Sequence, residues 1–264
     1  NDDSILVFPD IVKMYPSTDV IEAVAKVENN HTANPNDYGF TTDCVVEALR
    51  ICNECNCIQF NGKYYLPCKG VATGPAHACE MTDIRIGSIT EKHLQTCPVE
   101  TIHFSIYRDD GLDVLPGGEA DLPALVQHFS TLHTNLDWEF KSGKDGAYLD
   151  LWVMLKDGKI ETKIFTKSEP VYVGPSSCHD PKVFKSIFKG VGLRIRLNCS
   201  EDKDFDEAVE SYSKALAISG YNFQTARSEL MKSKHIDRVE YLKTEKERKQ
   251  NVKNNKNKKV FWIS

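Results

Sequence analysis

The hydrophobic and polar positions of the first half of the chain predict alternating strands and helices. The apolar run SILVFPD (residues 4–10) predicts a short buried strand that ends at the Pro9-Asp10 break. STDVIEAVAKVENN and TTDCVVEALRICNEC each begin with helix-capping residues and continue with apolar residues at helical spacing. CIQFNGKYYL contains the Asn61-Gly62 pair typical of a hairpin turn, and a glycine-bearing loop then precedes a helix predicted from about Pro75.

The second half continues with strands and then becomes helical. Residues 101–106 and 111–115 predict a hairpin, and a helix is expected to begin near Asp121. Three strand-like runs follow, namely LDWEFK, AYLDLWVML and KIETKIFTK, and from Asp180 onward the spacing is helical. We therefore expect an α+β part at residues 1–175, a helical part at 176–241, and a basic, partly disordered tail at 242–264.

Composition and charge narrow the class of protein. The chain is 41% hydrophobic and 27% charged, as in globular proteins, and contains no apolar run of about 18 residues, so no membrane partner is expected. The tail carries eight Lys or Arg and two Glu, a charge of +6. Because the whole chain has a net charge of −5, the preceding residues carry a net charge of −11. Any basic track for nucleic acid must therefore be local.

The nine cysteines favour reduced thiols within a cell over a disulfide framework. The densest group, CNECNC at residues 52–57, has no second Cys pair at zinc-binding spacing downstream. Cys178 and His179 would complete such a site only by a long-range coincidence. Buried or incidental thiols are the favoured interpretation.

The segment IHFSIYRDDGLDVL (102–115) places two adjacent acids at the tip of the predicted hairpin. Two interpretations are open, a polar turn or a metal site, because neighbouring carboxylates repel unless a cation lies between them. The order of elements lets the first strand pair beside this hairpin, so that Asp10, Asp109 and Asp110 converge at one end of a sheet. Two Mg²⁺ ions about 4 Å apart need such a cluster.

This arrangement resembles the palm of reverse transcriptases, and among them the Penelope-like retroelement type. DIVKMYPS supplies an aspartate and an aromatic residue, GVATG resembles the family's glycine loop, and YRDD is similar to its aromatic-x-Asp-Asp motif. The downstream runs from Ala147 and from Ser176 look like the family's later strands and the beginning of its thumb. The resemblance implies a polymerase-type palm, a ferredoxin-like antiparallel sheet with helices on one face, followed by a helical thumb-like region.

The resemblance also implies roles for individual residues. Asp10, Asp109 and Asp110 would hold two Mg²⁺ ions, for which Mn²⁺ can substitute, and the main-chain carbonyl of Ile11 would be a further ligand. Tyr15 would pack beneath the incoming sugar and exclude a 2′-hydroxyl. The other implied nucleotide-binding residues are Gly70, Gly74 and Lys167, and the implied nucleic-acid-binding residues are Tyr107, Arg194 and Arg196, the last two in a segment that could be strand-like.

Four features depart from that family. The basic fingers expected before Asp10 are missing, and so is the glutamine usual before the glycine loop. Arg108 stands where a small or apolar residue is preferred, and Gly111 follows the acids where an apolar strand residue is usual. On a strand, Arg108 would point away from Tyr107 and Asp109, into the other face of the sheet or out to solvent.

The sequence thus predicts an RNA-directed DNA polymerase core of a mobile element. It would join dNTPs to a primer 3′-hydroxyl on an RNA or DNA template. We expect a fragment of a longer protein, with an intracellular and nuclear location, that polymerises poorly or not at all when isolated. Two alternatives remain: a palm-like scaffold that binds nucleic acid or protein without catalysis, and a viral RNA polymerase, which Tyr15 disfavours.

Overall fold

The computed structural model describes residues 3–33, 39–132 and 135–255. These residues form two compact units, Asn1–Tyr148 and Leu149–Ser264. The division falls between Tyr148 and Leu149, earlier in the chain than the expected palm boundary at residue 175. Each unit is described below by itself.

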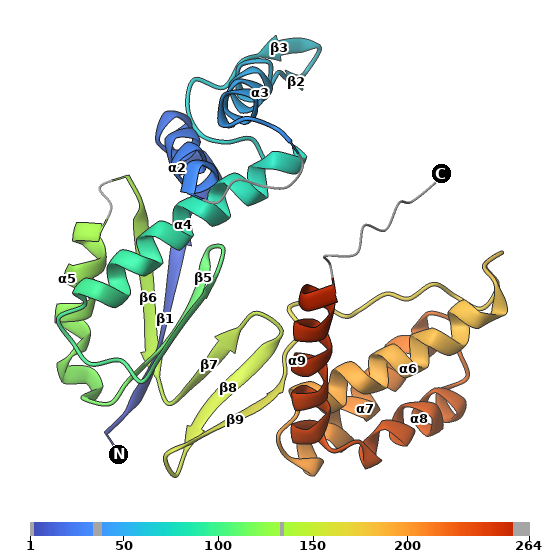
Figure 1. Cartoon of the computed structure of the whole chain (residues 1–264). Coiled ribbons are helices and arrows are strands. Elements are labelled where there is room, and N and C mark those ends of the chain that lie inside the picture. Colours follow the sequence, from blue (N-terminus) through green and yellow to red (C-terminus); the bar gives the residue numbers. More distant parts are fainter. Residues whose placement is uncertain (1–2, 34–38, 133–134, 256–264) are drawn as a thin grey trace. The chain divides into compact units, whose positions relative to one another are not determined.

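The first unit is built on a four-stranded antiparallel sheet with the strand order β4-β5-β1-β6 (Figure 1). The strands are β1 (Ile5–Val12), β4 (His103–Tyr107), β5 (Asp110–Leu115) and β6 (Asp137–Gly143). The predicted first strand and the predicted hairpin are therefore observed. The first strand does not end at Pro9-Asp10, however, but continues to Val12, because β6 pairs with it residue by residue as far as Val12.

Two helices cover one face of this sheet. Helices α4 (Ala76–Thr96) and α5 (Leu122–Leu132) place apolar side chains against alternate residues of β1, which form the core with them. The main core residues are Ile5, Val7, Ile11, Ile86, Ile89, Leu125, Phe129 and Leu132. Because successive side chains of a strand point to opposite faces, the even-numbered residues of β1 face away from these helices.

Most of the remaining elements of the first unit lie between β1 and β4 in sequence. The short helix α1 (Met14–Ser17) is followed by α2 (Val20–Ala33) and α3 (Thr42–Glu54), which pack with the beginning of α4 around a second small core. The predicted hairpin is present as β2 (Ile58–Phe60) and β3 (Lys63–Tyr65), with Asn61 and Gly62 at positive φ as such a turn requires. A short 3₁₀ turn (Gly118–Ala120) precedes α5, and β7 (Asp145–Tyr148) ends the unit.

The second unit consists of a hairpin and helices. β8 (Leu151–Lys156) pairs with β9 (Lys159–Ile164), and the helices are α6 (Pro181–Asn198), α7 (Asp202–Ile218), α8 (Phe223–Met231) and α9 (Arg238–Asn255), with a 3₁₀ turn at Lys232–His235. Their core includes Ile195, Phe205, Leu216 and Leu230. The run AYLDLWVML, expected as one strand, is divided between β7 and β8, since Leu149 adopts a φ of 53° that interrupts the extended backbone.

The expected tail is partly helical. Its residues 242–255 belong to α9, and residues 256–264 lie outside the described residues. Across the described part of the chain, helices lack the length and apolar character that a membrane crossing requires.

Candidate active site

Three carboxylates form a row across the sheet of the first unit. Asp10 in β1 is directly opposite Asp110 in β5 on one side and Glu139 in β6 on the other. Directly opposed residues of antiparallel strands project from the same face of a sheet. The next residue, Ile11, is buried in the core, so Asp10 faces away from α4 and α5. The row therefore lies on the sheet face that these two helices leave uncovered.

The turn between β4 and β5 brings Asp109 to the same end of the sheet. Tyr107 pairs with Asp110, which leaves Arg108 and Asp109 as the two turn residues. The N–H of Ile11 donates a hydrogen bond of 3.0 Å to the carbonyl oxygen of Asp109. The main chain of the YRDD turn is thus fixed beside Asp10, the arrangement that the order of elements predicted.

The electrostatics of the row follow from this geometry. Partial burial raises the pKa of Asp10, and the nearby charges of Asp110, Asp109 and Glu139 raise it further, while Lys141 opposes them. A cluster of hard carboxylate oxygens is the donor set that Mg²⁺ or Mn²⁺ neutralises, so these residues fit a divalent ion. The oxygens of Asp10, Asp109 and Asp110 do not all lie within 4.8 Å of one another.

Glu139 was not singled out from the sequence. In LDWEFK, Trp138 and Phe140 alternate with Glu139 and pack against the core. This alternation signals that Glu139 faces the other side of the sheet. Only the pairing of β6 with β1 puts it beside Asp10.

Tyr15 lies in α1, immediately after β1. Its hydroxyl is 3.4 Å from Sγ of Cys79 in α4, and its carbonyl oxygen accepts a 2.9 Å hydrogen bond from the N–H of Val71. The contact with Cys79 is the main cause that raises the pKa of Tyr15, and partial burial adds to it. The ring packs against both apolar cores of the unit. Tyr15 is therefore held by Cys79, by the loop at Val71 and by the two apolar cores.

Gly70 explains how the glycine loop reaches this position. It has a φ of +83°, and a Cβ there would lie 2.7 Å from the carbonyl oxygen of Pro16 and 2.8 Å from its Cα. Only glycine allows this contact, which brings the loop against α1 beside Tyr15. The close approach that requires Gly70 is thus to the protein's own backbone. Gly74 has a φ of +120° and open space around it.

Comparisons with known proteins bear on the fold. No family model matches the chain, and no curated protein matches it. Among solved structures, a telomerase from Candida albicans, in complex with a TWJ fragment of telomeric RNA, matches with a TM-score of 0.56 and 12% identity over 87% of this chain and 40% of its own. The RNA-dependent RNA polymerase of a human picobirnavirus matches with a TM-score of 0.55 and 16% identity over 88% of this chain and 46% of its own. An apo telomerase from Candida tropicalis matches with a TM-score of 0.53 and 12% identity over 91% of this chain and 44% of its own.

The chain has a reverse-transcriptase-like polymerase fold. It spans less than half the length of these polymerases. In this polymerase-type fold the four-stranded sheet with α4 and α5 corresponds to the predicted palm, and a helical, thumb-like region follows it. The fold class predicted from the sequence is confirmed.

Arg108 of the palm occupies the turn rather than a strand. Its φ is 59°, a left-handed conformation that is uncommon for a residue with a side chain. The guanidinium carbon lies 5.3 Å from the centre of the exposed Tyr107 ring, and Nε lies 3.8 Å from Oδ1 of Asp83 in α4. The guanidinium is therefore directed to Asp83 and Tyr107. The sequence predicted instead that it points into the other face of the sheet or out to solvent.

The remaining predicted residues lie in the second unit. Lys167 is exposed in the loop after β9. Arg194 and Arg196 are in α6, so the strand-like interpretation of their segment is wrong; the segment continues the helix that begins at Pro181. Nη2 of Arg194 is 2.8 Å from Oδ2 of Asp150, and Nε of Arg196 donates to the carbonyl oxygen of Ile236 at 3.0 Å. Both arginines make contacts within their own unit.

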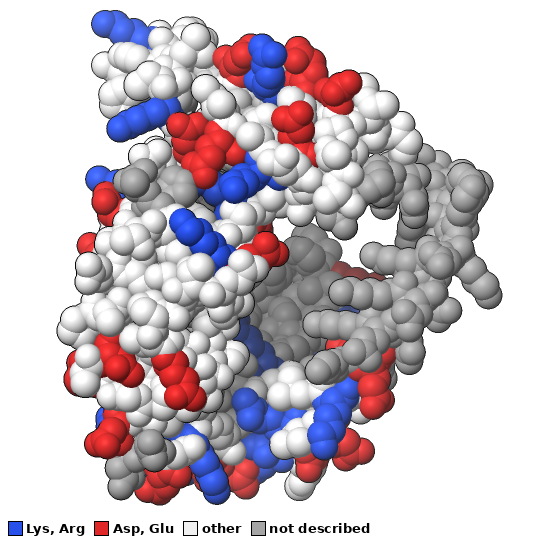
Figure 2. Space-filling view, turned by 60° about the vertical axis from the view of Figure 1, so that its left-hand side comes forward, with Lys and Arg blue, Asp and Glu red and all other residues white. Residues whose placement is uncertain are grey.

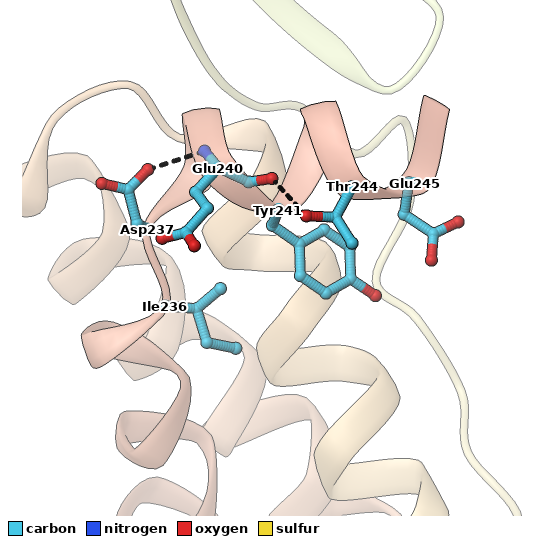
Figure 3. A pocket seen from close by; sticks show the side chains of 6 residues that line it. All are labelled: Ile236, Asp237, Glu240, Tyr241, Thr244 and Glu245. Atoms are coloured by element: carbon cyan, nitrogen blue, oxygen red, sulfur yellow. Dashed lines mark hydrogen bonds between the residues drawn. The ribbon is translucent and has the colours of Figure 1, made fainter. Parts of the chain in front are cut away.

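A surface pocket of about 230 Å³ lies at the beginning of α9, and none of the predicted site residues lines it (Figure 3). Asp237 caps this helix by accepting a hydrogen bond from the N–H of Glu240, and the Thr244 hydroxyl bonds to the carbonyl of Glu240. The bond between Asp237 and Glu240 is that of a capped helix start. On the face shown in Figure 2, Lys and Arg side chains lie next to Asp and Glu, consistent with local rather than extended basic tracks.

Proposed function

We propose that this chain is the palm and thumb portion of an RNA-directed DNA polymerase, which transfers nucleotides from dNTPs to a primer 3′-hydroxyl. One observation carries the proposal. Asp10 is paired with Asp110, and Asp109 is tied to Ile11, at the same end of a palm-type sheet. The RNA-bound telomerase neighbour supports a nucleic-acid partner, and the motifs in the sequence support the choice of reverse transcriptase. The narrower assignment to a Penelope-like retroelement rests on those motifs alone.

The acids have a defined task in this proposal. Asp10, Asp109 and Asp110 would hold two Mg²⁺ or Mn²⁺ ions, with the main-chain carbonyl of Ile11 as a further ligand, since the Ile11 side chain is buried in the core. Such ions, when bound, activate the 3′-hydroxyl and stabilise the departing pyrophosphate. Glu139, opposite Asp10, adds negative charge to the same face and would strengthen cation binding.

Other residues would orient the substrates. Tyr15, held by Cys79 and by the loop at Gly70, would form a fixed surface under the deoxyribose and exclude a 2′-hydroxyl. Lys167, Arg194 and Gly74 are proposed as contacts to nucleotide and primer-template, and the exposed Tyr107 ring as a contact to nucleic acid. For a polymerase that copies at chromosomes we propose nuclear access, which the basic sequence after Leu242 would favour.

The test is primer extension on an RNA template by the full-length parent protein. We expect dNTP incorporation that depends on Mg²⁺ and falls to background in Asp109→Asn and in Asp10→Asn. Asp157→Asn is a matched control, because Asp157 also occupies a hairpin turn, between β8 and β9, and is exposed. Its activity should equal that of the wild type. Loss of activity in the control alone, or retention in both acid variants, would contradict the proposal.

A second measurement separates the polymerase from a palm-like scaffold without catalysis. The isolated chain, although expected to extend primers poorly, should bind Mn²⁺ detectably by electron paramagnetic resonance, and Asp109→Asn should abolish the binding. A parent protein that binds RNA but neither extends primers nor binds Mn²⁺ at these acids would favour the scaffold. Competition between rNTPs and dNTPs in the same assay distinguishes an RNA-synthesising enzyme.

A further inference from the structure

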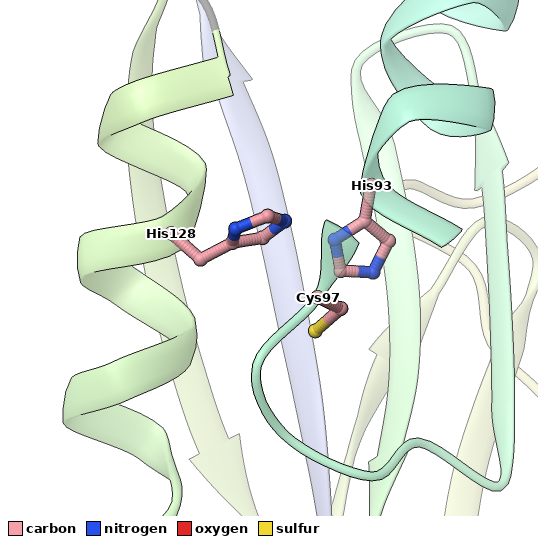
Figure 4. Close-up of side chains that lie close together, drawn as sticks. All are labelled: His93, Cys97 and His128. Carbon is pink, nitrogen blue, oxygen red and sulfur yellow. The ribbon is translucent and has the colours of Figure 1, made fainter. Parts of the chain in front are cut away.

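A second group of metal-ligating side chains lies on the opposite side of the palm sheet. His93 is in the last turn of α4, Cys97 directly follows that helix, and His128 is in α5 (Figure 4). The N–H of Cys97 donates a 2.9 Å hydrogen bond to the carbonyl oxygen of His93, which keeps the two side chains four residues apart on one helical turn. This group is on the helix-covered side and is separate from Asp10 and its neighbours.

The three side chains converge on one point. One ligand atom from each, a ring nitrogen or the sulfur, lies within 4.8 Å of both of the others. Figure 4 shows the imidazoles of His93 and His128 directed toward each other from their two helices, with the thiol of Cys97 beside them. A tetrahedral zinc ion with ordinary bond lengths needs ligand atoms about 3.3–3.6 Å apart, so a contraction of at most about 1.5 Å would complete the geometry.

The polar atoms of this group are buried and unsatisfied. His93 is 1% exposed, and neither of its ring nitrogens has a hydrogen-bond partner among the described residues. The same holds for Nε2 of His128 and for both carboxylate oxygens of Asp113, a fully buried residue of β5. Buried polar groups are normally paired, so three such side chains together indicate a ligand.

Asp113 occupies the position of an outer partner. Its Oδ2 lies 4.0 Å from Nε2 of His93, which leaves Nδ1 of His93 as the nitrogen available toward Cys97 and His128. Metal-bound histidines commonly direct their second nitrogen to a carboxylate in this way. Burial lowers the pKa of His93 to about 4, so the imidazole is neutral at physiological pH and its contact with Asp113 is not an ion pair.

A core histidine without any ligand is the simpler explanation. The ring of His93 packs between those of Phe104 and Phe129, with centroid distances of 4.4 and 4.6 Å, and this packing accounts for the burial of its carbon atoms. It does not account for the two nitrogens, for Asp113, or for the approach of Cys97 and His128. A histidine that only packs against aromatic rings needs none of these.

We propose that His93, Cys97 and His128 bind one Zn²⁺ ion, which clamps the end of α4 to α5 behind the palm sheet, with Asp113 orienting His93. Thiolate and imidazole donors together favour zinc over the hard cations that carboxylates select. Three protein ligands leave a fourth position for water or a substrate group. Burial raises the pKa of the Cys97 thiol, so zinc binding would displace the thiol proton into the solvent.

The test is a titration of the chelator-stripped full chain with Zn²⁺ in competition with a chromophoric chelator, and with Co²⁺ as a spectroscopic substitute. We expect one equivalent of Zn²⁺ per chain, and a Co²⁺ complex with a thiolate charge-transfer band. Cys97→Ser should remove that band, and Cys97→Ser and His128→Gln should each weaken Zn²⁺ binding by at least about 10-fold. Both residues are only partly buried, so both variants are expected to fold, which circular dichroism will verify.

Two control variants and one further test variant accompany these measurements. The exposed thiols of Cys52, Cys55 and Cys57 are replaced together by serine, which should leave the Zn²⁺ affinity unchanged. Asp113→Asn, which keeps the shape of the side chain, should weaken Zn²⁺ binding about 10–100-fold. Asp10→Asn should leave Zn²⁺ binding intact, so this proposal and that of the polymerase site can fail separately.

The opposite results would overturn the proposal. These are a wild-type chain that takes up less than one equivalent of Zn²⁺, a Co²⁺ complex without a thiolate band, or binding that is lost in the triple serine control but kept in Cys97→Ser. The absence of the band in the wild type is decisive even if a variant fails to fold.

Discussion

Pro9 and Gly111 oppose each other in neighbouring strands, at a distance that only a glycine permits. A Cβ at Gly111 would lie 2.9 Å from the carbonyl oxygen of Pro9 and 3.0 Å from Cγ of its ring. The register places Asp10 opposite Asp110 immediately beside this pair. Gly111, which departs from the pattern of reverse transcriptases, is therefore matched to a proline that immediately precedes the candidate catalytic Asp10.

Substitution of Gly111 by alanine should destabilise the protein by about 1–3 kcal/mol, because the added methyl group overpacks the strand pair at Pro9. Urea unfolding followed by circular dichroism measures the change. Gly87→Ala is the matched control: Gly87 lies within α4 with nothing within 4 Å of an added Cβ, and alanine there should stabilise by about 0.5–1 kcal/mol. Equal stabilities of the two variants would show that the contact with Pro9 is unimportant.

Gly70→Ala should cost more than a substitution at another glycine with positive φ. At Gly62 an added Cβ meets nothing, so Gly62→Ala carries only the left-handed conformational penalty of about 1–2 kcal/mol. Gly70→Ala carries that penalty together with a clash against the backbone of Pro16, worth about 1–3 kcal/mol more. The comparison uses the free energies of unfolding in urea, and the prediction fails if Gly62→Ala proves the more harmful change.

Tyr15 should determine the preference for dNTPs over rNTPs if the chain acts as proposed. Tyr15→Val removes the ring and should reduce the preference for dNTP over rNTP, as the ratio of kcat/KM values, by about 10–200-fold. Tyr15→Phe loses only the hydroxyl contact with Cys79 and should keep the preference. Single-nucleotide incorporation by the full-length parent protein measures both. If the ratio of kcat/KM values for dNTP and rNTP is unchanged in Tyr15→Val, Tyr15 contributes only to packing.

The second unit should become less stable at alkaline pH. Burial raises the pKa of Tyr212 above its ordinary value of about 10, and burial raises that of Tyr172 to about 12. The folded state therefore holds protons that the unfolded state releases, so this contribution is complete below about pH 10 and is lost as the pH rises through the folded pKa values. Thermal unfolding at pH 9 and at pH 10.5 measures the loss.

Tyr212→Phe identifies the source of that pH dependence. The buried Tyr212 hydroxyl has no hydrogen-bond partner among the described residues, so its removal should leave stability at pH 7 unchanged or raise it by about 1 kcal/mol. The variant should lose less stability between pH 9 and pH 10.5 than the wild type. Tyr64→Phe, at an exposed residue of β3, should behave as the wild type. A Tyr212→Phe variant with the full alkaline loss would refute the assignment.

The sequence by itself determined the elements whose signals are local. Apolar spacing predicted β1, α2, α3 and the helices after Asp180, and Asn61-Gly62 predicted its hairpin, because periodicity and turn chemistry act between near neighbours. It also placed Asp109 in a hairpin turn and Asp10 toward the end of a strand, and their order allowed the two to converge. Local patterns could not reveal that Leu149 interrupts a strand or that Arg108 is left-handed, since both conformations are imposed by the surrounding structure.

The tertiary structure alone decided which distant residues meet. Glu139 stands beside Asp10 because β6 pairs with β1, and His93, Cys97 and His128 meet because α4 and α5 pack on the same face of the sheet. Gly70 approaches Pro16 because the N–H of the next residue, Val71, bonds to the carbonyl oxygen of Tyr15. Apart from the contact between His93 and Cys97, which lie four residues apart, each contact joins segments far apart in the sequence, where neither spacing nor periodicity carries information. Such contacts arise only when strands pair and apolar faces are buried together.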